Sequence, residues 1–232
     1  MSLKINGLQK LTLLDYPNKV ACTFFTYGCN FRCPFCHNKT LVTDKNEGEI
    51  NYQEIMDFLV SKKKMLDGIC LTGGEPLLHD EVFDFFKDVR NLGLSIKLDT
   101  NGSFPDKLEK IINDNLVDYV AMDIKNCKER YSETCGVSVD ISKIERSVDI
   151  LMTSNIEYEF RTTIVSEFHD NESIEKLVKW IKGAKAYYLQ NFVDNHHLIG
   201  NASGVSLEKM HEFLSIAKNY IANSNLRGIW YI

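Results

Sequence analysis

Three of the seven cysteines in this chain, Cys29, Cys33 and Cys36, lie within eight consecutive residues. The C-x3-C-x2-C spacing lets three thiolates on one loop converge on a single soft metal centre. A ferredoxin-type iron–sulfur cluster is held by four cysteines, and this loop supplies three. Three protein ligands leave a coordination position open, which is typical of a catalytic metal site. The loop alone also leaves open a zinc site in which His37 is the fourth ligand.

A pair of glycines follows the next predicted strand, in the sequence Thr72-Gly73-Gly74-Glu75-Pro76. Glycine lets the backbone come close to a ligand, so carbonyl groups and the Glu75 carboxylate are candidate acceptors for an ammonium group. Taken alone, this sequence is more often a tight turn. Its position one strand after the cysteine loop favours a ligand site.

Polar and charged residues end three further predicted strands. They are Asp99, Thr100 and Asn101 on the third strand, Asp123 and Lys125 on the fourth, and Arg161 on the fifth. Asp123 and Lys125 alternate with apolar residues, so they share the face that points away from the outer helices. Charges in that position are costly unless they are paired or bind a ligand. One interpretation is contact with a cofactor; the other is a structural network of ion pairs among Asp99, Asp123, Lys125 and Arg161.

Together these motifs resemble those of the radical S-adenosylmethionine (SAM) superfamily. The resemblance implies a 4Fe-4S cluster on the three cysteines, with the open iron chelated by the methionine part of SAM. The Asp99–Gly102 and Met122–Lys125 motifs, and the His37-Asn38 pair after Cys36, are similar to those of the glycyl-radical-enzyme activases. This likeness also implies a monovalent cation near the aspartates. The residues it assigns to cofactor binding are His37, Asn38, Gly73, Gly74, Glu75, Asp99, Thr100, Asn101, Asp123, Lys125 and Arg161.

The opening segment from Gly7 to Pro17 and the cysteine loop look most like the longer activating proteins of anaerobic ribonucleotide reductases. The resemblance implies reductive cleavage of SAM to methionine and a 5′-deoxyadenosyl radical, which abstracts hydrogen from a glycine of the partner enzyme. It also implies a flavodoxin or ferredoxin as electron donor. Because the cofactor carries the reactive chemistry, we assign no protein side chain as catalytic acid, base or nucleophile.

Two alternatives stay open at this point. One is a radical SAM enzyme that acts on a small molecule such as a deazapurine precursor, although deazapurine synthases tend to have an acidic residue where this chain has His37. The other is a non-catalytic zinc or iron–sulfur module.

The composition of the 232 residues is ordinary for a soluble globular protein, with 44% hydrophobic and 25% charged residues. A net charge of -5 argues against a dedicated nucleic-acid binder. We find no signal-peptide pattern and no apolar run near the roughly 20 residues that span a bilayer. We therefore expect a cytoplasmic protein with no membrane partner, in which the cysteines are metal ligands or buried thiols.

Six β-rich segments alternate with segments of helical periodicity. The predicted strands are Val20–Thr26, Gly68–Thr72, Leu94–Thr100, Val117–Lys125, Ile156–Val165 and Lys185–Phe192. Capping signals predict helix starts near Asn51, Pro105, Ser142 (paired with Glu145 as a capping box) and Ser206. Six strand–helix units imply a parallel sheet covered by helices, and eight are needed for a closed barrel. We therefore predict an α/β fold, a partial (open) parallel (β/α)6 TIM-like barrel, as one domain over residues 1–232.

Ligands of such sheets bind at the carboxyl ends of the strands, which is where the motifs above lie. The segments Asn126–Ile141 and Asn191–Val205 are longer than usual connections, and we expect both at this end, where a substrate enters. Cys127 and Cys135 in the first of these segments are interpreted as structural, because two cysteines do not hold a second cluster.

Overall fold

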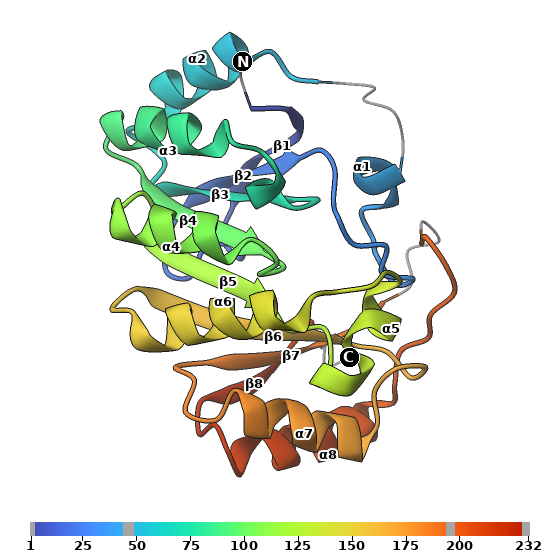
Figure 1. The fold of residues 1–232 in the computed structure, drawn as a ribbon. Helices are drawn as coiled ribbons and strands as arrows, with labels where there is room; N and C mark the ends of the chain where they lie inside the picture. The colour runs from blue at the N-terminus through green and yellow to red at the C-terminus, as the bar shows by residue number, and fades with distance from the viewer. Residues whose placement is uncertain (1–2, 44–48, 194–197, 229–232) are drawn as a thin grey trace. The chain divides into compact units, whose positions relative to one another are not determined.

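The computed structural model describes residues 3–43, 49–193 and 198–228 (Figure 1). The chain divides into two compact units. The first contains residues 1–30 and 40–121, and the second contains residues 31–39 and 122–232. The chain therefore crosses the boundary three times. The crossings lie inside the cysteine loop, at the start of the helix α1 (Lys39–Thr43) and inside the strand β5 (Tyr119–Asp123).

The first unit has four complete strands, which follow one another in chain order. The strands are β1 (Ile5–Thr12), β2 (Ala21–Thr26), β3 (Gly68–Gly73) and β4 (Ser95–Thr100). β1 is antiparallel to β2, whereas β2, β3 and β4 are parallel neighbours. Backbone bonding continues from β4 to the residue before β5, because the Asp118 amide donates to the Ile96 carbonyl at 2.8 Å.

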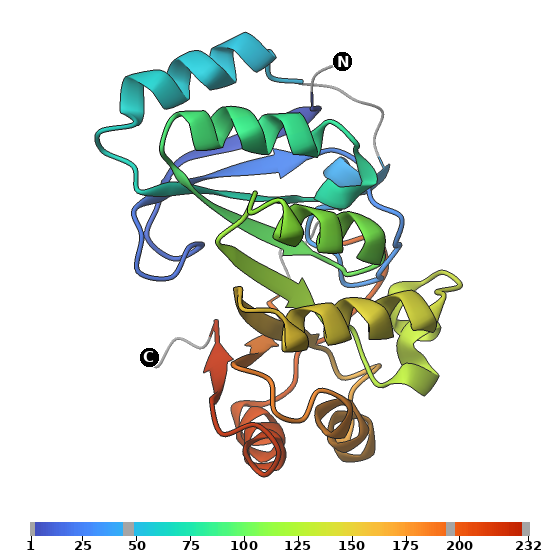
Figure 2. The same cartoon turned by 60° about the vertical axis from the view of Figure 1, so that its left-hand side comes forward.

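The helices of the first unit present buried apolar residues to these strands. They are α1 (Lys39–Thr43), α2 (Tyr52–Lys62), the short 3-10 helix η1 (Pro76–Leu78), α3 (Val82–Asn91) and α4 (Pro105–Asn113). Leu59, Phe86 and Ile111 have no exposed surface, which places the core between the helices and the strands. Figures 1 and 2 show α2, α3 and α4 along one side of the strands of this unit.

The second unit is built from parallel strands that alternate with helices. Its strands after β5 are β6 (Glu157–Ile164), β7 (Tyr187–Asn191) and β8 (Ser224–Arg227). Its helices are η2 (Lys128–Arg130), α5 (Tyr131–Cys135), α6 (Ile141–Thr153), α7 (Asn171–Trp180) and α8 (Leu207–Lys218). The registers β6–β7 and β7–β8 are parallel. The Ile124 amide donates to the Arg161 carbonyl at 2.8 Å and so connects the end of β5 to β6.

All six predicted strands are present, and each is followed by its predicted helix. The strands β1 and β8 were not predicted. β1 has an interior of half-exposed and exposed residues, and β8 has four residues, so neither contains a continuous apolar run. In the part of the chain that the structure describes, β1 and β8 each have a strand neighbour on one side only, so they are the first and last strands of an open sheet.

The predicted helix starts are confirmed at Pro105 and Ser206, and Asn51 caps α2 through the amide of Gln53. The predicted capping box of Ser142 and Glu145 is wrong. Asp140 is the N-cap of α6, and its side chain accepts from the Ser142 amide at 3.2 Å. A carboxylate two residues earlier competes successfully for the free amides of the helix.

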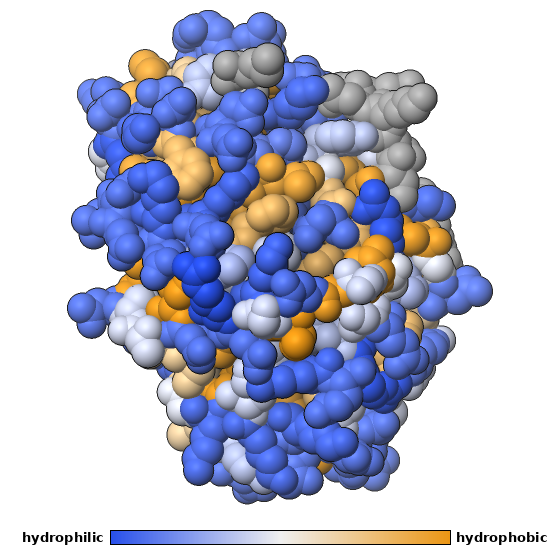
Figure 3. All heavy atoms as spheres, in the orientation of Figure 1, coloured by the Kyte–Doolittle hydropathy of each residue, from blue (hydrophilic) through white to orange (hydrophobic). Residues whose placement is uncertain are grey.

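The face drawn in Figure 3 is mostly hydrophilic, with smaller apolar areas between the polar side chains. Among the described residues, no helix is both long and apolar enough to cross a membrane.

Candidate active site

The predicted site residues are divided between the two units. The first unit contains Cys29, Gly73, Gly74, Glu75, Asp99, Thr100 and Asn101. The second unit contains Cys33, Cys36, His37, Asn38, Asp123, Lys125 and Arg161. Most of them stand at or just after the carboxyl end of a strand, as the sequence predicts. Each set is described within its own unit.

The two glycines of the first unit pack against the start of the cysteine loop. A Cβ atom at Gly74 would stand 1.8 Å from the Gly28 carbonyl oxygen, and one at Gly73 would stand 2.3 Å from the Thr26 amide nitrogen. The Gly73 φ angle of +115° also favours glycine. The Glu75 amide donates to the Gly28 carbonyl at 2.8 Å. Gly73 therefore permits a close approach to the end of β2, and Gly74 permits one to the residue that precedes Cys29.

Glu75 connects the ends of β3 and β4. Its side chain is fully buried, and one carboxylate oxygen accepts from the Leu77 amide at 3.0 Å and from the Thr100 hydroxyl at 2.8 Å. The other oxygen accepts from the Asn101 amide at 2.7 Å. The sequence suggested a ligand for an ammonium group, whereas the structure gives the carboxylate three donors from the chain itself. Its contacts position Thr100 and Asn101.

Asn101 directs its side-chain amide at the cysteine loop. The Nδ2 atom lies 3.9 Å from the Cys29 sulfur and 3.0 Å from the Asn30 side-chain oxygen. Asn30 in turn donates to the Ser103 hydroxyl at 2.9 Å. Asn30 and Ser103 were not predicted; their neighbours Cys29 and Asn101 were the only sequence signal for them. A motif at the end of β4 thus supports the first cysteine.

Asp99 forms an ion pair with Lys97, two residues earlier on the same face of β4. The Lys97 side chain is 2% exposed, and its ammonium also lies 3.8 Å from the Cys70 sulfur. Burial of an ammonium group requires such partners. The sequence interpretation missed Lys97, although strand alternation already places it on the face of Asp99.

In the second unit, Asp123 bridges two cations. Its carboxylate oxygens lie 2.9 Å from the Lys125 ammonium and 3.0 Å from the Arg161 guanidinium. Burial by itself raises the pKa of Asp123, but the adjacent Lys125 and Arg161 outweigh it and lower the pKa to about 2. Burial likewise opposes the charge of Lys125, and the neighbouring Asp123 and Cys33 raise its pKa above the usual range. All three side chains stay charged near neutral pH, with a net charge of +1.

Cys33 and Cys36 are held by contacts from within the second unit. The Cys135 thiol hydrogen-bonds to the Cys33 sulfur; this contact outweighs burial and, with Lys125, lowers the pKa of Cys33. The backbone amide of Asn38 donates to the Cys36 sulfur, although burial raises the pKa of Cys36. His37 stacks on Phe192 with ring centroids 5.0 Å apart, and its Nε2 atom lies 2.7 Å from the Val193 carbonyl. The loop is thus fastened to the chain segment that follows β7.

The donor set fits an iron–sulfur cluster. All seven cysteines are free thiols, and each of the three predicted ligand sulfurs has a hydrogen-bond donor directed at it, from Asn101, Cys135 or Asn38. Hydrogen bonds to sulfur orient and tune such ligands. Within residues 3–43, 49–193 and 198–228, no three His, Cys, Asp or Glu side chains form a ready-made metal site. The joint use of the three cysteines therefore stays a prediction from their spacing.

Comparison with known proteins decides the family. The family model described as the radical SAM superfamily matches residues 23–181, more than half of the chain. The chain belongs to the radical SAM superfamily. Its matched region begins in β2, before the cysteine loop, and includes every predicted site residue. Membership implies a 4Fe-4S cluster and SAM as cofactors of this radical SAM enzyme, as the sequence analysis expected.

Two relatives within the superfamily are named as activating enzymes. The chain is 33% identical over 240 residues to a protein of Methanocaldococcus jannaschii provisionally named a glycyl-radical enzyme activating enzyme, covering 99% of this chain and 98% of the relative. It is 26% identical over 176 residues to the pyruvate formate-lyase 1-activating enzyme of Escherichia coli, covering 73% of this chain and 70% of the relative. The predicted resemblance to the activases is confirmed.

A solved structure confirms the fold class. The crystal structure of a radical SAM methyltransferase from Sphaerobacter thermophilus matches with a TM-score of 0.68 over 94% of this chain and 68% of that chain. The sequence identity is 14%, so the likeness concerns the fold alone. The predicted α/β fold with an open parallel sheet is the fold of this radical SAM enzyme.

Proposed function

We propose that this radical SAM enzyme activates a glycyl radical enzyme, and that its partner is an anaerobic ribonucleotide reductase. The observation that carries the activase function is the end-to-end likeness to the M. jannaschii protein, which covers 99% of this chain. The choice of a ribonucleotide reductase depends on the Gly7–Pro17 opening and the cysteine loop of the sequence. The chain also contains no inserted cysteine-rich segment for further clusters.

The proposed cluster ligands are Cys29, Cys33 and Cys36, with SAM on the open iron. When bound, the cluster would pass one electron from an external donor to SAM, and SAM would then supply methionine and a 5′-deoxyadenosyl radical able to abstract hydrogen from the partner's glycine. The chain itself binds and orients these cofactors and excludes water from them. We propose a flavodoxin or ferredoxin as electron donor, no nucleic-acid partner, and a cytoplasmic location.

The charges of the second unit suit the anionic end of SAM. Asp123, Lys125 and Arg161 together carry one net positive charge at half-buried positions, where Coulombic attraction is stronger than in bulk water. We propose that this cluster attracts the methionine carboxylate of SAM, and that His37, Asn38, Gly73, Gly74 and Glu75 act by holding the cysteine loop. Asp99, Thr100 and Asn101 are proposed to face the ribose and adenine.

A monovalent cation near Asp99 and Asp123 stays part of the proposal. Both carboxylates already have partners within their own unit, Lys97 for Asp99 and Lys125 with Arg161 for Asp123. We therefore expect the cation to act when SAM brings in a further carboxylate. We also propose that residues 1–232 act as one domain, because the matched region 23–181 contains residues of both units.

The test combines the reconstituted protein with candidate partners under anaerobic conditions. With SAM, a reductant and an anaerobic ribonucleotide reductase, we expect a glycyl radical signal in the electron paramagnetic resonance spectrum. The matched control is pyruvate formate-lyase, with which we expect a much weaker signal. The reverse order of the two signals would contradict the choice of partner. No signal with either, together with turnover of a purine-like molecule, would contradict the activase function.

A further inference from the structure

One buried histidine of the second unit has no part in the proposed chemistry, although it contacts the backbone that carries Lys125. His169 lies in the turn between β6 and α7 and is 4% exposed. Its Nε2 atom lies 3.0 Å from the Lys125 carbonyl oxygen. Its Nδ1 atom lies 3.1 Å from the Val165 amide nitrogen. Both ring nitrogens therefore bond to backbone atoms.

The backbone partners determine which ring nitrogen of His169 carries the proton. A carbonyl oxygen can only accept, so Nε2 carries the proton and donates it to Lys125. Nδ1 then accepts from the Val165 amide, and the ring is neutral. Burial lowers the pKa of His169 and outweighs the contacts with the Lys125 and Val165 carbonyls, which raise it. The direction of this shift agrees with a neutral ring.

Three successive carbonyl groups at the end of β5 each accept a hydrogen bond from a buried side chain. The pairs are Tyr131 with Asp123 at 3.4 Å, Thr162 with Ile124 at 2.7 Å and His169 with Lys125 at 3.0 Å. β5 itself ends at Asp123, so Lys125 lies two residues beyond the strand. His169 therefore fixes the last of the three carbonyls, where the strand has already ended.

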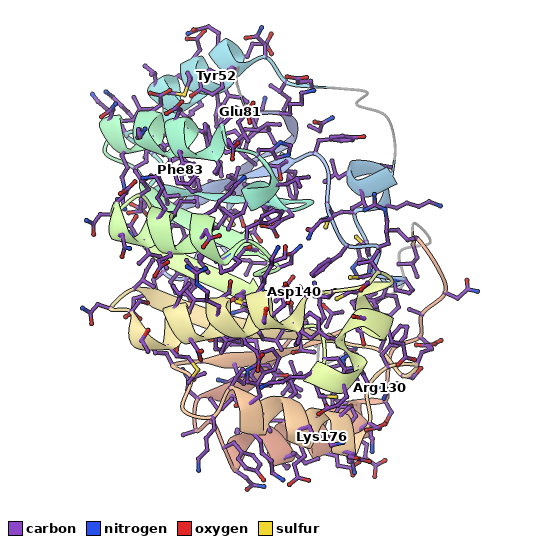
Figure 4. All side chains as sticks on the ribbon, in the orientation of Figure 1. Tyr52, Glu81, Phe83, Arg130, Asp140 and Lys176 are labelled. Carbon is purple, nitrogen blue, oxygen red and sulfur yellow. The ribbon has the colours of Figure 1, made fainter. Side chains whose placement is uncertain are left out.

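The turn that carries His169 is held by contacts of the residues on both sides of it. Arg130, labelled in Figure 4, donates to the Glu167 carbonyl at 3.3 Å and forms an ion pair with Asp170 at 3.1 Å. Asp170 is also the N-cap of α7. A shift of His169 away from Lys125 would break these contacts.

The same turn contacts the cysteine loop. The Phe168 ring packs on the Phe35 ring of that loop, with the ring centroids 6.1 Å apart. The Phe168 carbonyl accepts from the Asn126 side chain at 2.8 Å. Two adjacent residues of the turn, Phe168 and His169, thus contact the cysteine loop and the backbone around Lys125.

We propose that His169 is a positioning residue for SAM, because its hydrogen bond fixes the backbone from which the Lys125 side chain reaches the methionine carboxylate. This role rests on the proposed function. The Lys125 ammonium already lies 2.9 Å from the Asp123 carboxylate, so a backbone shift would change its distance to both carboxylates. The methionine carboxylate keeps its charge during cleavage, so its interaction with Lys125 contributes equally to binding and to the transition state. Loss of the His169 hydrogen bond therefore raises KM for SAM and leaves kcat unchanged.

Two substitutions separate the two ring contacts. In His169→Gln the side-chain amide nitrogen takes the place of Nε2 and still donates to the Lys125 carbonyl. In His169→Asn the side-chain oxygen takes the place of Nδ1, so only the contact with the Val165 amide is kept. His211→Asn makes the same change at an exposed position of α8 and is the control.

The hydrogen bond itself is tested in the metal-free protein. Nitrogen NMR of the imidazole at neutral pH is expected to show the His169 proton on Nε2. The Ile124 amide, which donates to the Arg161 carbonyl at 2.8 Å, reports on the backbone before Lys125. Its hydrogen exchange should be about tenfold faster in His169→Asn and close to natural in His169→Gln. A proton on Nδ1 alone, or equal exchange in the two variants, would overturn the proposal.

Kinetics of the reconstituted enzyme test the role toward SAM. His169→Asn is expected to raise KM for SAM about tenfold with kcat unchanged, whereas His169→Gln and His211→Asn keep both values. A fall in kcat without a rise in KM would overturn the positioning role. If the natural protein binds no SAM, the proposed function fails and this role fails with it. If the natural protein binds SAM and His169→Asn binds it equally well, only the role of His169 fails.

Discussion

The Glu75 carboxylate accepts a hydrogen bond from the backbone amide of Asn101 at 2.7 Å, across 26 residues of sequence. This bond joins the turn after β3 to the turn after β4. Asn101 then directs its side-chain amide at the Cys29 sulfur, 3.9 Å away. Glu75 therefore acts on the first cysteine through Asn101, and Gly74 acts on the same loop through Gly28.

Replacement of Glu75 by alanine is expected to destabilise the metal-free protein by about 3 kcal/mol. The reason is that the amides of Leu77 and Asn101 and the Thr100 hydroxyl would lose their buried acceptor. The measurement is urea unfolding followed by circular dichroism. Glu75→Gln keeps one acceptor oxygen and should cost less. Equal stability of the alanine variant and the natural chain would contradict this role of Glu75.

Gly74→Ala is expected to disrupt the cysteine loop. The added Cβ would stand 1.8 Å from the Gly28 carbonyl oxygen, so the backbone before Cys29 must move. We expect reduced iron incorporation, measured as iron per chain after anaerobic reconstitution. Gly93→Ala is the control, because a Cβ there has open space and only its φ angle of +79° is strained. Its cost should be about 1 kcal/mol in stability, with normal iron content. Equal iron content in the two variants would argue against close packing at Gly74.

Cys29→Ala, Cys33→Ala and Cys36→Ala are each expected to abolish cluster formation. Anaerobic reconstitution of the natural chain should give about four iron and four sulfide per chain and a brown chromophore. Cys22→Ala and Cys70→Ala are the controls; both thiols are fully buried within strands and should leave the iron content unchanged. Stoichiometric zinc without a chromophore would contradict the iron–sulfur assignment and support the zinc alternative.

The sequence was most informative where one residue type has one strong physical consequence. Cysteine spacing identified the loop, and apolar periodicity identified six strands and six helices. It was least informative where a side chain serves a partner distant in sequence. Nothing in the motif Gly73-Gly74-Glu75 shows that the carboxylate would be enclosed by Leu77, Thr100 and Asn101, because that depends on how β3 and β4 pair.

The partners of charged residues were also only partly predictable from the sequence. The alternation of charges on β5 suggested that Asp123 and Lys125 share a face, and the structure pairs them at 2.9 Å. Asp99 was grouped with them because all four residues end strands, but its partner in the structure is Lys97 on its own strand. A buried lysine inside a strand has no sequence signal that distinguishes it from an exposed one, except the identity of the residues beside it.

Asp123 is expected to make the stability of the protein depend on acid pH. Its pKa is lowered to about 2 in the folded chain from an ordinary value of 3.8, so its contribution is fully present above about pH 4 and is lost as the pH falls through 2. We expect the natural chain to lose about 1 kcal/mol more than Asp123→Asn between pH 5 and pH 3. Urea unfolding at the two pH values measures this. If both proteins lose the same free energy of unfolding between the two pH values, Asp123 does not stabilise the fold through its ion pairs.

Asn201→Arg is expected to impair activation of the partner about tenfold while leaving SAM cleavage in its absence unchanged. Asn201 is exposed and follows Gly200, whose amide donates to the Pro34 carbonyl of the cysteine loop at 2.9 Å. Under the proposed function, the partner's glycine belongs to a folded chain, and we expect it to reach the cysteine loop past the Asn191–Val205 segment. Residues 194–197 of that segment lie outside the described residues.

A substitution is preferable to shortening the Asn191–Val205 segment, because the segment also supports the cysteine loop through the His37–Val193 and Gly200–Pro34 contacts. Asn219→Arg makes the same change at the exposed C-cap of α8 and serves as the control. The measurements are the glycyl radical yield with whole reductase and 5′-deoxyadenosine formation without it. A short peptide with the partner's glycine motif should be a poor hydrogen donor for both variants alike, since it needs no docking surface. If Asn201→Arg activates the whole partner as well as Asn219→Arg does, the Asn191–Val205 segment does not dock the substrate, and the radical chemistry is unaffected by that result.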